Sequence, residues 1–387
     1  MLFARFARKV IQTGRLTIID AHGRRHVAGG PGGPVATLRL HDKALHYRLA
    51  LNPYLYLGEA YMDGTLTIEQ GSLYDFLNIC AINMDRAFEQ PLKRVLSAAA
   101  KVLRHLHQHN PARLARAHVA HHYDLSDRLY DLFLDADRQY SCGYFSHRHH
   151  DLERAQRDKK RHLAAKLRLA PGQRVLDIGS GWGGLALYLA EVGGGEVLGI
   201  TLSQEQLRTS RLRAERAGMA DRVRFELCDY REQTGSFERI VSVGMFEHVG
   251  VKHYGEFFAK IRELLTEDGV AVLHSIGRMD GPGDTNDWVR KYIFPGGYAP
   301  ALSEVCPWPS ACSSGSPTSR CCGCTTPKPC AAGASASWRT GPRSPGCTTS
   351  VFAGCGSSIW SARSSRFGAW ATWCFRCSSP NDRTRCR

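Results

Sequence analysis

A glycine-rich turn between a buried strand and a helix has the residue types of a ligand-binding site. The stretch RVLDIGSGWGGLALYLAEV covers residues 174–192 and begins with a short apolar run. Glycines then occupy positions 179, 181, 183 and 184, and apolar residues follow at roughly helical spacing. Such a turn lets N–H groups at a helix N-terminus approach a ligand, and the missing Cβ atoms leave room for a nucleoside. The pattern therefore predicts a binding turn, although an ordinary tight turn has the same letters.

Two kinds of nucleoside ligand fit this turn. Gly179, Gly181 and Gly184 match the G-x-G-x-x-G pattern of dinucleotide sites, which need an acidic residue about 20 positions further on to hold a ribose. The second strand, EVLGITLS, carries no acid at its end, which weakens this interpretation. Asp177, two residues before the first glycine and followed by G-x-G-x-G, instead resembles the S-adenosylmethionine loop of class I methyltransferases.

Length and charge limit the classes of protein. With 387 residues the chain is long enough for two domains, and its net charge of +15 favours an anionic partner, either nucleic acid or a membrane surface. No run of 18 apolar residues is present, so no transmembrane span is predicted. The start, MLFARFARKVIQTGRL, is basic and amphipathic but lacks the apolar core of a secretory signal. It is expected to be a helix of a cytoplasmic protein.

Residues 1–85 are expected to form a small α+β domain. LTIIDAHGRRHVAG predicts two strands around a turn at Ala21–Gly23. The alternation of Leu45, Tyr47, Leu49 and Leu51 predicts a further, half-buried strand. No residue here indicates chemistry, so the hypothesis is a structural or lipid-facing module.

A basic linker over residues 86–119 is expected to be helical. Seven basic residues accompany one carboxylate between positions 86 and 118, and apolar residues supply another face. Basic amphipathic helices bind anionic membrane surfaces, although a solvated linker helix would show the same pattern. The histidines at 105, 107 and 109 fall on different helix faces, so no metal site is predicted.

Seven ordered motifs resemble a single family. They are AHHYDLSDRLYDLFLD, YSCGYF, VLDIGSGWGG, GITLSQEQ, SVGMFEHVG, VLHSIG and YIFPGGYAPALSEV. Together they resemble the cyclopropane-fatty-acyl-phospholipid synthase family and its mycolic acid cyclopropane synthase relatives. The resemblance covers about residues 1–305. It implies an α/β fold, with a doubly wound class I methyltransferase sheet over residues 120–305 after the small N-terminal domain.

The resemblance also implies which residues hold S-adenosylmethionine. They are Tyr140 and Ser141 before the motif cysteine, the glycine loop from Val175 to Gly183 with Asp177, Gly179 and Gly181, then Thr201 to Gln206, and finally Asp229 and Tyr230. Ligands of doubly wound sheets lie at the carboxyl ends of the strands, which agrees with these positions.

A second residue set binds bicarbonate in the family. The resemblance maps four of its five ligands to Cys142, Glu247, His274 and Ile276, whereas the fifth, a tyrosine, has no match. In the reaction it implies, an alkene attacks the sulfonium methyl group, and a base then removes a proton from the resulting carbocation so that the ring closes. Bicarbonate would be that base, oriented by Glu247 and His274 in a dry pocket lined by Tyr144, Phe145 and Phe246.

Glu247 and His274 each have a plainer explanation. Glu247 alone is compatible with a helix cap, and His274 alone with a hydrogen-bonded core histidine. Both are expected just beyond strands four and five, at the same end of the sheet as the glycine turn. This coincidence favours a functional role.

The predicted activity is transfer of a methylene group from S-adenosylmethionine to a cis-unsaturated phospholipid acyl chain, which forms a cyclopropane ring. Plain C-methylation of the same chains is the alternative within the enzyme class. A basic nucleic-acid-binding methyltransferase is the other alternative, but the sequence has neither an N/D-P-P-[YF] motif nor a basic-aromatic platform, so no nucleic acid is expected. The expected partners are unsaturated acyl chains and an anionic phospholipid membrane, at its inner face. A homodimer stays open, and no metal is expected.

The tail over residues 306–387 differs in composition from the rest. Eleven of the 14 cysteines lie there, Asp382 is its only acid, and residues 306–330 show no helical or strand periodicity. We therefore expect a disordered tail that is an out-of-frame translation and leaves the enzyme inactive. The alternatives are a genuine cysteine-rich tail, a secreted disulfide module, and a zinc module of Cys321, Cys322, Cys324 and Cys330.

Overall fold

The computed structural model describes residues 2–83, 127–147, 149–278, 281–308 and 369–376. The chain divides into two compact units, each with its own sheet. The first unit comprises residues 2–83 and Gly283–Pro295. The second comprises the other described residues, from 127 to Pro282 and from Gly296 onward. The predicted basic linker lies outside the described residues. Within the described part of the chain, no helix has the length and apolar character needed to cross a membrane.

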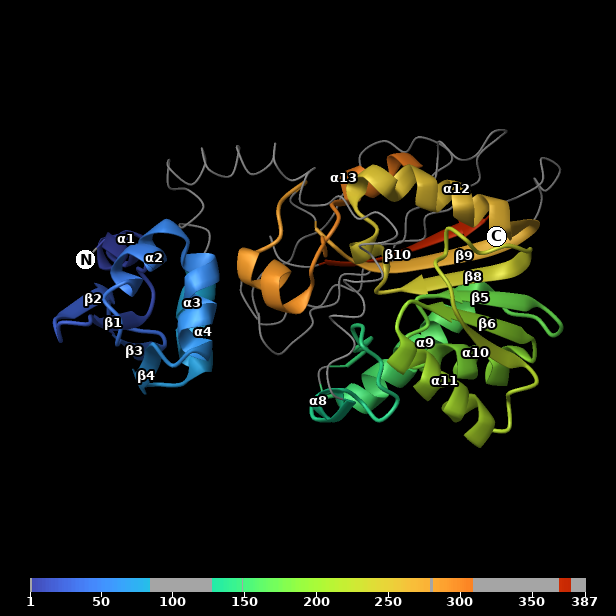
Figure 1. Cartoon of the computed structure of the whole chain (residues 1–387), viewed down its shortest axis with the longest axis horizontal. Helices are drawn as coiled ribbons and strands as arrows, with labels where there is room; N and C mark the ends of the chain where they lie inside the picture. Colours follow the sequence, from blue (N-terminus) through green and yellow to red (C-terminus); the bar gives the residue numbers. More distant parts are fainter. Residues whose placement is uncertain (1, 84–126, 148, 279–280, 309–368, 377–387) are drawn as a thin grey trace. The chain divides into compact units, whose positions relative to one another are not determined.

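The N-terminal unit is a four-stranded sheet with helices packed on it (Figure 1). Its elements are α1 (Leu2–Val10), β1 (Arg15–Ile19), β2 (Arg25–Gly29), β3 (Val35–Leu40), α2 (Leu45–Leu51), α3 (Pro53–Met62), β4 (Leu66–Gln70) and α4 (Leu73–Ile82). The strand order is β2-β1-β3-β4. The predicted hairpin is confirmed, because β1 and β2 pair antiparallel from Arg15–Gly29 to Ile19–Arg25. The predicted N-terminal helix is also confirmed as α1, which buries Phe3 and Ala7.

The half-buried strand predicted around Leu45–Leu51 is wrong. These residues form helix α2, in which Leu45 and Leu49 are buried while Tyr47 and Leu51 are 67% and 80% exposed. A strand would have buried all four on one face, whereas a helix places only residues i and i+4 together. The alternating apolar letters fit both periods at this length, and packing of Leu45 and Leu49 into the unit's core selects the helix.

A later segment of the chain completes this first unit. It contains a short π-helix, η3 (Val289–Ile293), beside α3. The Nζ atom of Lys291 lies 2.6 Å from Oε1 of Glu59, and the hydroxyl of Tyr292 donates to the same oxygen at 2.9 Å. The amide of Asn52 donates to Asp287 at 2.6 Å. Residues more than 200 positions apart are therefore joined by polar contacts within one unit.

The second unit is built on a six-stranded sheet with the order β10-β9-β8-β5-β6-β7 (Figure 1). Its strands are β5 (Arg174–Ile178), β6 (Glu196–Thr201), β7 (Val223–Leu227), β8 (Phe237–Val243), β9 (Leu265–Gly277) and β10 (Ala369–Arg376). β5 to β9 are parallel, and the order reverses between β5 and β8. This doubly wound sheet confirms the predicted fold class. The reversal point, at the carboxyl ends of β5 and β8, is where such sheets bind ligands.

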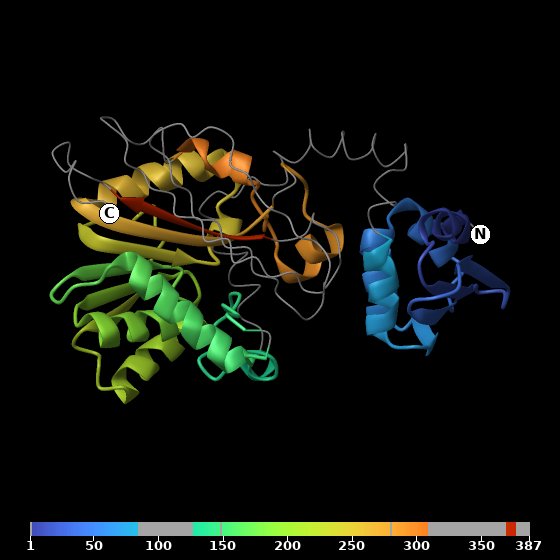
Figure 2. The same cartoon turned by 180° about the vertical axis from the view of Figure 1, so that it is seen from behind.

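Helices cover both faces of this sheet. They are α8 (Asp127–Asp131), α9 (Leu152–Leu167), α10 (Gly184–Gly193), α11 (Gln204–Arg216), η1 (Phe246–His248), η2 (Val251–His253), α12 (Tyr254–Leu264) and α13 (Leu302–Val305). α9, α10 and α11 share one core with one face of the sheet, and α12 packs on the other face. Figure 2 shows α9 lying across its face of the sheet.

One segment of the tail forms a strand, where the sequence analysis expects no regular element. β10 pairs antiparallel with β9, from Ala369–Gly277 to Arg376–Val270. Its sequence, AWATWCFR, is rich in residues that favour strands, and β9 offers an unpaired edge. The other tail residues after position 308 lie outside the described part of the chain, including the four cysteines considered for zinc.

Candidate active site

A cavity opens at the carboxyl ends of β5, β6 and β8, where the sheet order reverses. Nine of the predicted site residues line it: Tyr140, Ser141, Asp177, Gly179, Gly181, Thr201, Gln206, Asp229 and Tyr230. They come from the segment before α9, the glycine turn, and the loops after β6 and β7. Tertiary folding thus brings together residues separated by up to 90 positions, as the resemblance implies.

The glycine turn keeps space open within this cavity. Gly179 has φ +81°, and a Cβ built on it would lie 2.9 Å from Cβ of Met245. The amides of Gly179 and Ser180 both donate to the carbonyl of Ile200, at 2.9 and 3.0 Å. These two amides therefore close the turn onto β6, whereas the sequence analysis expects turn amides to approach the ligand. The turn contributes chiefly the absence of side chains.

Asp177 places a buried carboxylate against the cavity. The residue is only 1% exposed, and its Oδ2 atom has no hydrogen-bond partner among the described residues. Burial raises the pKa of Asp177 to about 7, while the positive charge of Lys159 opposes this rise. An unsatisfied buried carboxylate oxygen favours a positively charged or hydrogen-donating ligand group. S-adenosylmethionine has such groups, its sulfonium and its amino group, so Asp177 fits this ligand.

The loops after β6 and β7 are held by internal hydrogen bonds. The hydroxyl of Thr201 donates to Gln206 at 2.7 Å, which fixes the start of α11. Asp229 is buried and accepts two hydrogen bonds from the guanidinium of Arg231, at 2.9 and 2.7 Å. Both Asp229 oxygens are thus engaged by a neighbour that also lines the cavity. Burial raises the pKa of the Tyr230 hydroxyl well above its usual range, so it stays neutral.

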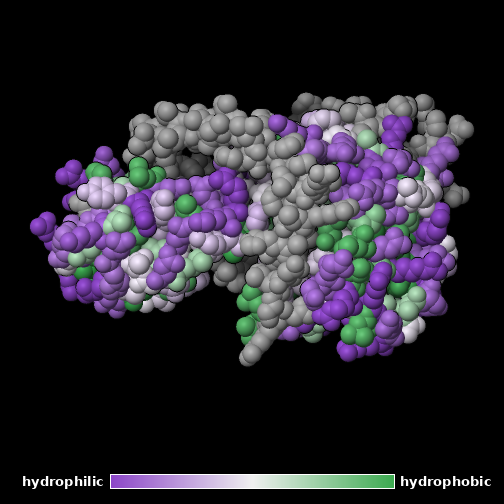
Figure 3. Space-filling view, viewed as in Figure 1, coloured by the Kyte–Doolittle hydropathy of each residue, from purple (hydrophilic) through white to green (hydrophobic). Residues whose placement is uncertain are grey.

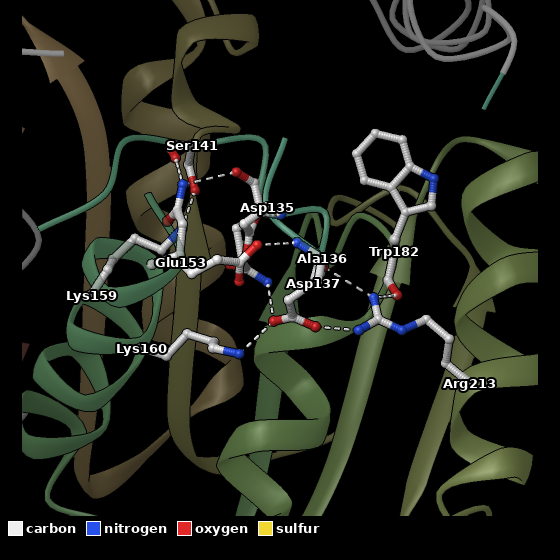
Figure 4. A network of polar contacts seen from close by, with 11 residues as sticks. Asp135, Ala136, Asp137, Ser141, Glu153, Lys159, Lys160, Trp182 and Arg213 are labelled. Carbon is white, nitrogen blue, oxygen red and sulfur yellow. Dashed lines mark hydrogen bonds and ion pairs between the residues drawn. The ribbon is translucent and has the colours of Figure 1, made fainter. Parts of the chain in front are cut away.

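An ionic network fixes the segment that carries Tyr140 and Ser141 (Figure 4). The carboxylate of Asp137 accepts from Lys160 of α9 and from Arg213 of α11. The same guanidinium donates to the carbonyl of Trp182 in the glycine turn at 2.9 Å. Asp137 therefore ties the segment to two helices and to the turn, and a Cβ on Gly184 would collide with it.

The candidate base residues lie beside the cavity rather than in its lining. The backbone N–H of Ile276 donates to Oε1 of Glu247 at 2.6 Å, and Oε2 of Glu247 is buried without a hydrogen-bond partner among the described residues. His274 lies two residues earlier on β9, and its carbonyl accepts from the amide of Gly244, which lines the cavity. Cys142 directly follows the lining residue Ser141 and is in no disulfide bond with another described residue.

Burial sets the charge states of Glu247 and His274. It raises the pKa of Glu247 to about 7, against the opposing effect of the hydrogen bond from Ile276. It lowers the pKa of His274 to about 3, with help from the charge of Lys159. His274 is therefore a neutral imidazole at neutral pH, able to donate through one nitrogen and accept through the other. The structure places it within β9, not after it as the spacing predicts.

Three predicted residues take other positions. Val175 lies in the core under α9 and α10. Gly183 packs against the same core, because a Cβ built on it would lie 2.7 Å from Cζ of Phe225. Phe246, predicted to line the pocket, is fully buried and stacks on Tyr254 with ring centroids 4.3 Å apart. Each supports the site from within the core.

The sequence analysis missed other cavity residues. Arg138, Trp182, Met245 and His248 line the cavity. Trp182 and His248 stand inside quoted motifs, so their position next to Gly181 and Glu247 was an available signal. Met245 stands in the same motif as His248, SVGMFEHVG, whereas Arg138 lies outside every quoted motif. Arg138 has an unusual φ of +52°, which only the structure shows.

A doubly wound sheet with a glycine-rich first turn, and a cavity with the buried acidic residue Asp177 at its reversal point, is typical of the class of S-adenosylmethionine-dependent methyltransferases. Within that class, residues 110–313 match the model of the mycolic acid cyclopropane synthetase family. The chain belongs to this family, and it is therefore a methyltransferase of the cyclopropane synthase type.

Curated relatives agree with this assignment. A probable fatty acid methyltransferase of Pseudomonas putida is 36% identical over 288 residues, covering 71% of this chain and 69% of its own. A cyclopropane-fatty-acyl-phospholipid synthase of Escherichia coli K12 is 36% identical over 274 residues, with the same coverage. A tuberculostearic acid methyltransferase of Mycobacterium tuberculosis is 32% identical and covers 75% of this chain and 69% of its own.

A solved structure shares the fold alone. Coclaurine N-methyltransferase, bound to N-methylheliamine and S-adenosylhomocysteine, superposes with a TM-score of 0.50 at 22% identity. The match covers 60% of this chain and 71% of that one.

Proposed function

We propose that this site transfers a methylene group from S-adenosylmethionine to the cis double bond of an unsaturated phospholipid acyl chain, which forms a cyclopropane ring. The observation that carries the proposal is the buried carboxylate of Glu247, bonded to the Ile276 amide and lying next to the cofactor cavity. Ordinary methyl transfer to nitrogen or oxygen needs no such second site. The similarity to the Escherichia coli synthase supports the phospholipid substrate.

The chemistry explains why two adjacent sites are needed. The π electrons of the alkene form a bond to the methyl carbon as its bond to sulfur breaks, and S-adenosylhomocysteine leaves. An isolated alkene is a weak nucleophile, so the two reactants must be held in line and close together. The resulting carbocation must be kept from water, and loss of a proton from the new methyl group then closes the ring.

The groups around Glu247 suit a bound bicarbonate ion. We propose that it is held by Cys142, Glu247, His274 and Ile276, as the resemblance to the family implies. The unsatisfied Oε2 atom of Glu247 is able to accept a hydrogen bond from it, and the neutral His274 is able to donate one. Bicarbonate would supply the base that takes the proton.

An apolar surface beside the cavity supports a lipid substrate. Leu129, Leu132 and Phe133, in and after α8, are 44%, 77% and 49% exposed. Figure 3 shows hydrophobic residues reaching the surface in this part of the second unit. The ring of Phe133 lies 6.0 Å from that of Tyr140, which lines the cavity. Exposed apolar side chains of this kind suit contact with a membrane or an acyl chain.

A product assay tests the proposal. Purified protein is incubated with S-adenosylmethionine and vesicles of cis-unsaturated phosphatidylglycerol, and the fatty acids are then analysed by mass spectrometry before and after catalytic hydrogenation. A product heavier by one CH₂ unit that takes up no hydrogen under mild conditions supports cyclopropanation. A product of the same mass that does take up hydrogen identifies a methylene-branched chain. If the protein, translated in the intact reading frame, forms neither of these products, the proposal is contradicted.

C-methylation is the second candidate, and the names of two relatives favour it. The Pseudomonas putida and Mycobacterium tuberculosis proteins are both named methyltransferases rather than cyclopropane synthases. Methylation and cyclopropanation begin with the same attack and diverge only at the carbocation, so the same cavity serves both. The hydrogenation step above separates them.

A further inference from the structure

Residues 139–142 form the segment that joins the cofactor cavity to the base residues, and this segment rests on one face of α9. Three hydrogen bonds bind it there. Nζ of Lys159 donates to Oγ of Ser141 at 2.7 Å (Figure 4). Nε2 of Gln156 donates to the carbonyls of Gln139 and Ser141, at 3.1 and 2.8 Å. Neither Lys159 nor Gln156 lines the cavity, but Gln139 and Ser141 do.

This contact is buried and closely packed. Lys159 and Gln156 are each only 3% exposed. A Cβ on Gly143 would lie 2.8 Å from Cβ of Ala155, and the amide of Tyr144 donates to the carbonyl of Ala155 at 2.9 Å. The helix and the segment therefore meet with little space between them, and a loss of either polar side chain leaves buried groups unsatisfied.

Charge also concentrates at this point. The Lys159 side chain interacts electrostatically with Asp135, Asp137, Cys142, Asp177 of β5 and Lys160 of its own helix. It acts as well on His274 of β9. Burial lowers the pKa of Lys159 to about 7, and the acidic groups oppose this effect. Lys159 is thus the buried cation between the cofactor side and the base side of the site.

We propose that Lys159 and Gln156 are positioning residues for methyl transfer, which fix the segment 139–142 against the cavity. Consecutive residues of this segment serve both halves of the site, because Ser141 lines the cofactor cavity and Cys142 is a candidate base-site residue. A shift of the backbone here moves both halves relative to each other. Methyl transfer to a weak nucleophile tolerates little misplacement of the two reactants. The contacts of Lys159 and Gln156 therefore affect the reaction although neither side chain lines the cavity.

A double-mutant cycle on cofactor affinity tests the proposal without any acyl substrate. Lys159→Met, Ser141→Ala and the double variant are compared for S-adenosylhomocysteine binding by calorimetry, with Arg157→Met, an exposed cation of the same helix, as control. We expect each single variant to bind about 10- to 100-fold more weakly and the double variant to lose less than the two single losses combined, because both single variants remove the bond between Lys159 and Ser141. Affinity of Lys159→Met equal to the control, or additive losses, would overturn the proposal.

A second measurement follows the base side of the segment. The rate of Cys142 alkylation by iodoacetamide, read by peptide mass spectrometry, should rise several-fold in Gln156→Met over the Arg157→Met control, because loss of the two Gln156 bonds loosens the segment without removing the Lys159 charge that favours the Cys142 thiolate. An unchanged rate contradicts a loosened segment. Should Lys159→Met fail to fold, the S-adenosylhomocysteine affinity of Gln156→Met is compared with the same control and should again be weaker, since its side chain has no N–H to donate to the Gln139 and Ser141 carbonyls. The inference rests on the S-adenosylmethionine dependence of the family, so failure of the phospholipid proposal leaves these measurements meaningful.

Discussion

The backbone amide of Ile276 donates to the carboxylate of Glu247 across 2.6 Å, although 29 residues separate the two in the chain. This bond ties the end of β9 to η1, which directly follows β8 and a two-residue turn. The second carboxylate oxygen, Oε2, is buried and has no hydrogen-bond partner among the described residues. A buried acceptor in this state costs free energy unless a ligand satisfies it.

Glu247→Gln should abolish most of the activity while sparing the cofactor. The amide oxygen of glutamine still accepts from Ile276, but the side chain loses its charge. In the protein with its reading frame restored after codon 305, we expect kcat to fall about 10²-fold or more, because Glu247 orients the bicarbonate that takes the proton. The S-adenosylhomocysteine affinity, measured by calorimetry, should stay within about twofold of the wild type, because Glu247 does not line the cavity. Glu263→Gln, on the exposed side of α12, is the control. Equal activity of both variants would exclude a role for Glu247.

Gly179→Val should abolish cofactor binding. The substitution combines a positive φ with a Cβ only 2.9 Å from Met245, and the extra methyl groups fill the cavity. Gly172→Ala is the matched control, because that glycine has a similar φ of +78° with no atom within 4 Å of a built Cβ. We expect no measurable S-adenosylhomocysteine binding for Gly179→Val and wild-type affinity for Gly172→Ala. Tight NADH binding by the wild type without S-adenosylhomocysteine binding would contradict the assignment of S-adenosylmethionine to this cavity.

Asp177 should make the folded state less stable as the pH rises. Its pKa is about 7 in the folded chain and 3.8 ordinarily, so between these values the folded state binds a proton that the unfolded state has lost. The stabilising effect is present at the acidic end and is gone above about pH 7. Asp177→Asn removes this dependence. Relative to wild type, the variant should gain on the order of 4 kcal/mol in unfolding free energy between about pH 4 and pH 8.

Urea unfolding at both pH values measures this difference. The exposed Asp268→Asn serves as control and should show no such change. If Asp177→Asn and Asp268→Asn depend on pH in the same way, the buried carboxylate of Asp177 is not protonated in the folded chain.

Leu132→Ser should weaken use of membrane-bound substrate alone. Leu132 is 77% exposed next to the aromatic residues that lead to the cavity. Its loss removes apolar contact with a bilayer, so conversion of vesicle phospholipid should fall several-fold while S-adenosylhomocysteine affinity is kept. Val192→Ser, exposed on α10, should have no effect. Equal conversion by both variants would exclude Leu132 from the lipid-binding surface.

The basic linker should make membrane binding depend on salt. With seven basic residues and one carboxylate between positions 86 and 118, binding to anionic vesicles should weaken as salt rises, by about 1 kcal/mol for each basic residue near the surface. Sedimentation with anionic vesicles, neutral vesicles or duplex DNA at one fixed salt concentration compares the partners. Equal binding to both kinds of vesicle would exclude an electrostatic role, and preference for DNA would favour the nucleic-acid alternative.

The tail composition predicts a frameshift near codon 305. The family match ends at residue 313, and Tyr298, the last tyrosine of the chain, donates its hydroxyl to Glu304 at 2.7 Å. A fifth, tyrosine ligand for bicarbonate is therefore expected in another reading frame, within helices that would cover the acyl pocket. Translation of the coding DNA in its two other frames should yield a helix-patterned sequence with a tyrosine. Ordinary cyclopropanation by the 387-residue chain would contradict this prediction.

Local sequence signals determined the elements whose geometry depends on near neighbours. The glycine turn, the β1–β2 hairpin and α1 follow from residue types within a few positions, and the structure shows each one. Ordered motifs also indicated that Asp177, Thr201 and Asp229 lie at or just beyond the carboxyl ends of three successive strands, which parallel pairing brings to one edge. Their gathering around the cavity was therefore predictable from the sequence, because strand direction alone places them there.

Contacts between distant residues decided the rest. The apolar letters at Leu45–Leu51 fit a helix or a strand, and only packing in the core selected α2. Lys159 resembles any lysine of an amphipathic helix until the fold buries it against Ser141. The bond between Ile276 and Glu247 depends on where two strands end relative to each other. Burial and register are properties of the whole fold, so local sequence patterns could not fix the charge of Asp177 or the orientation of Glu247.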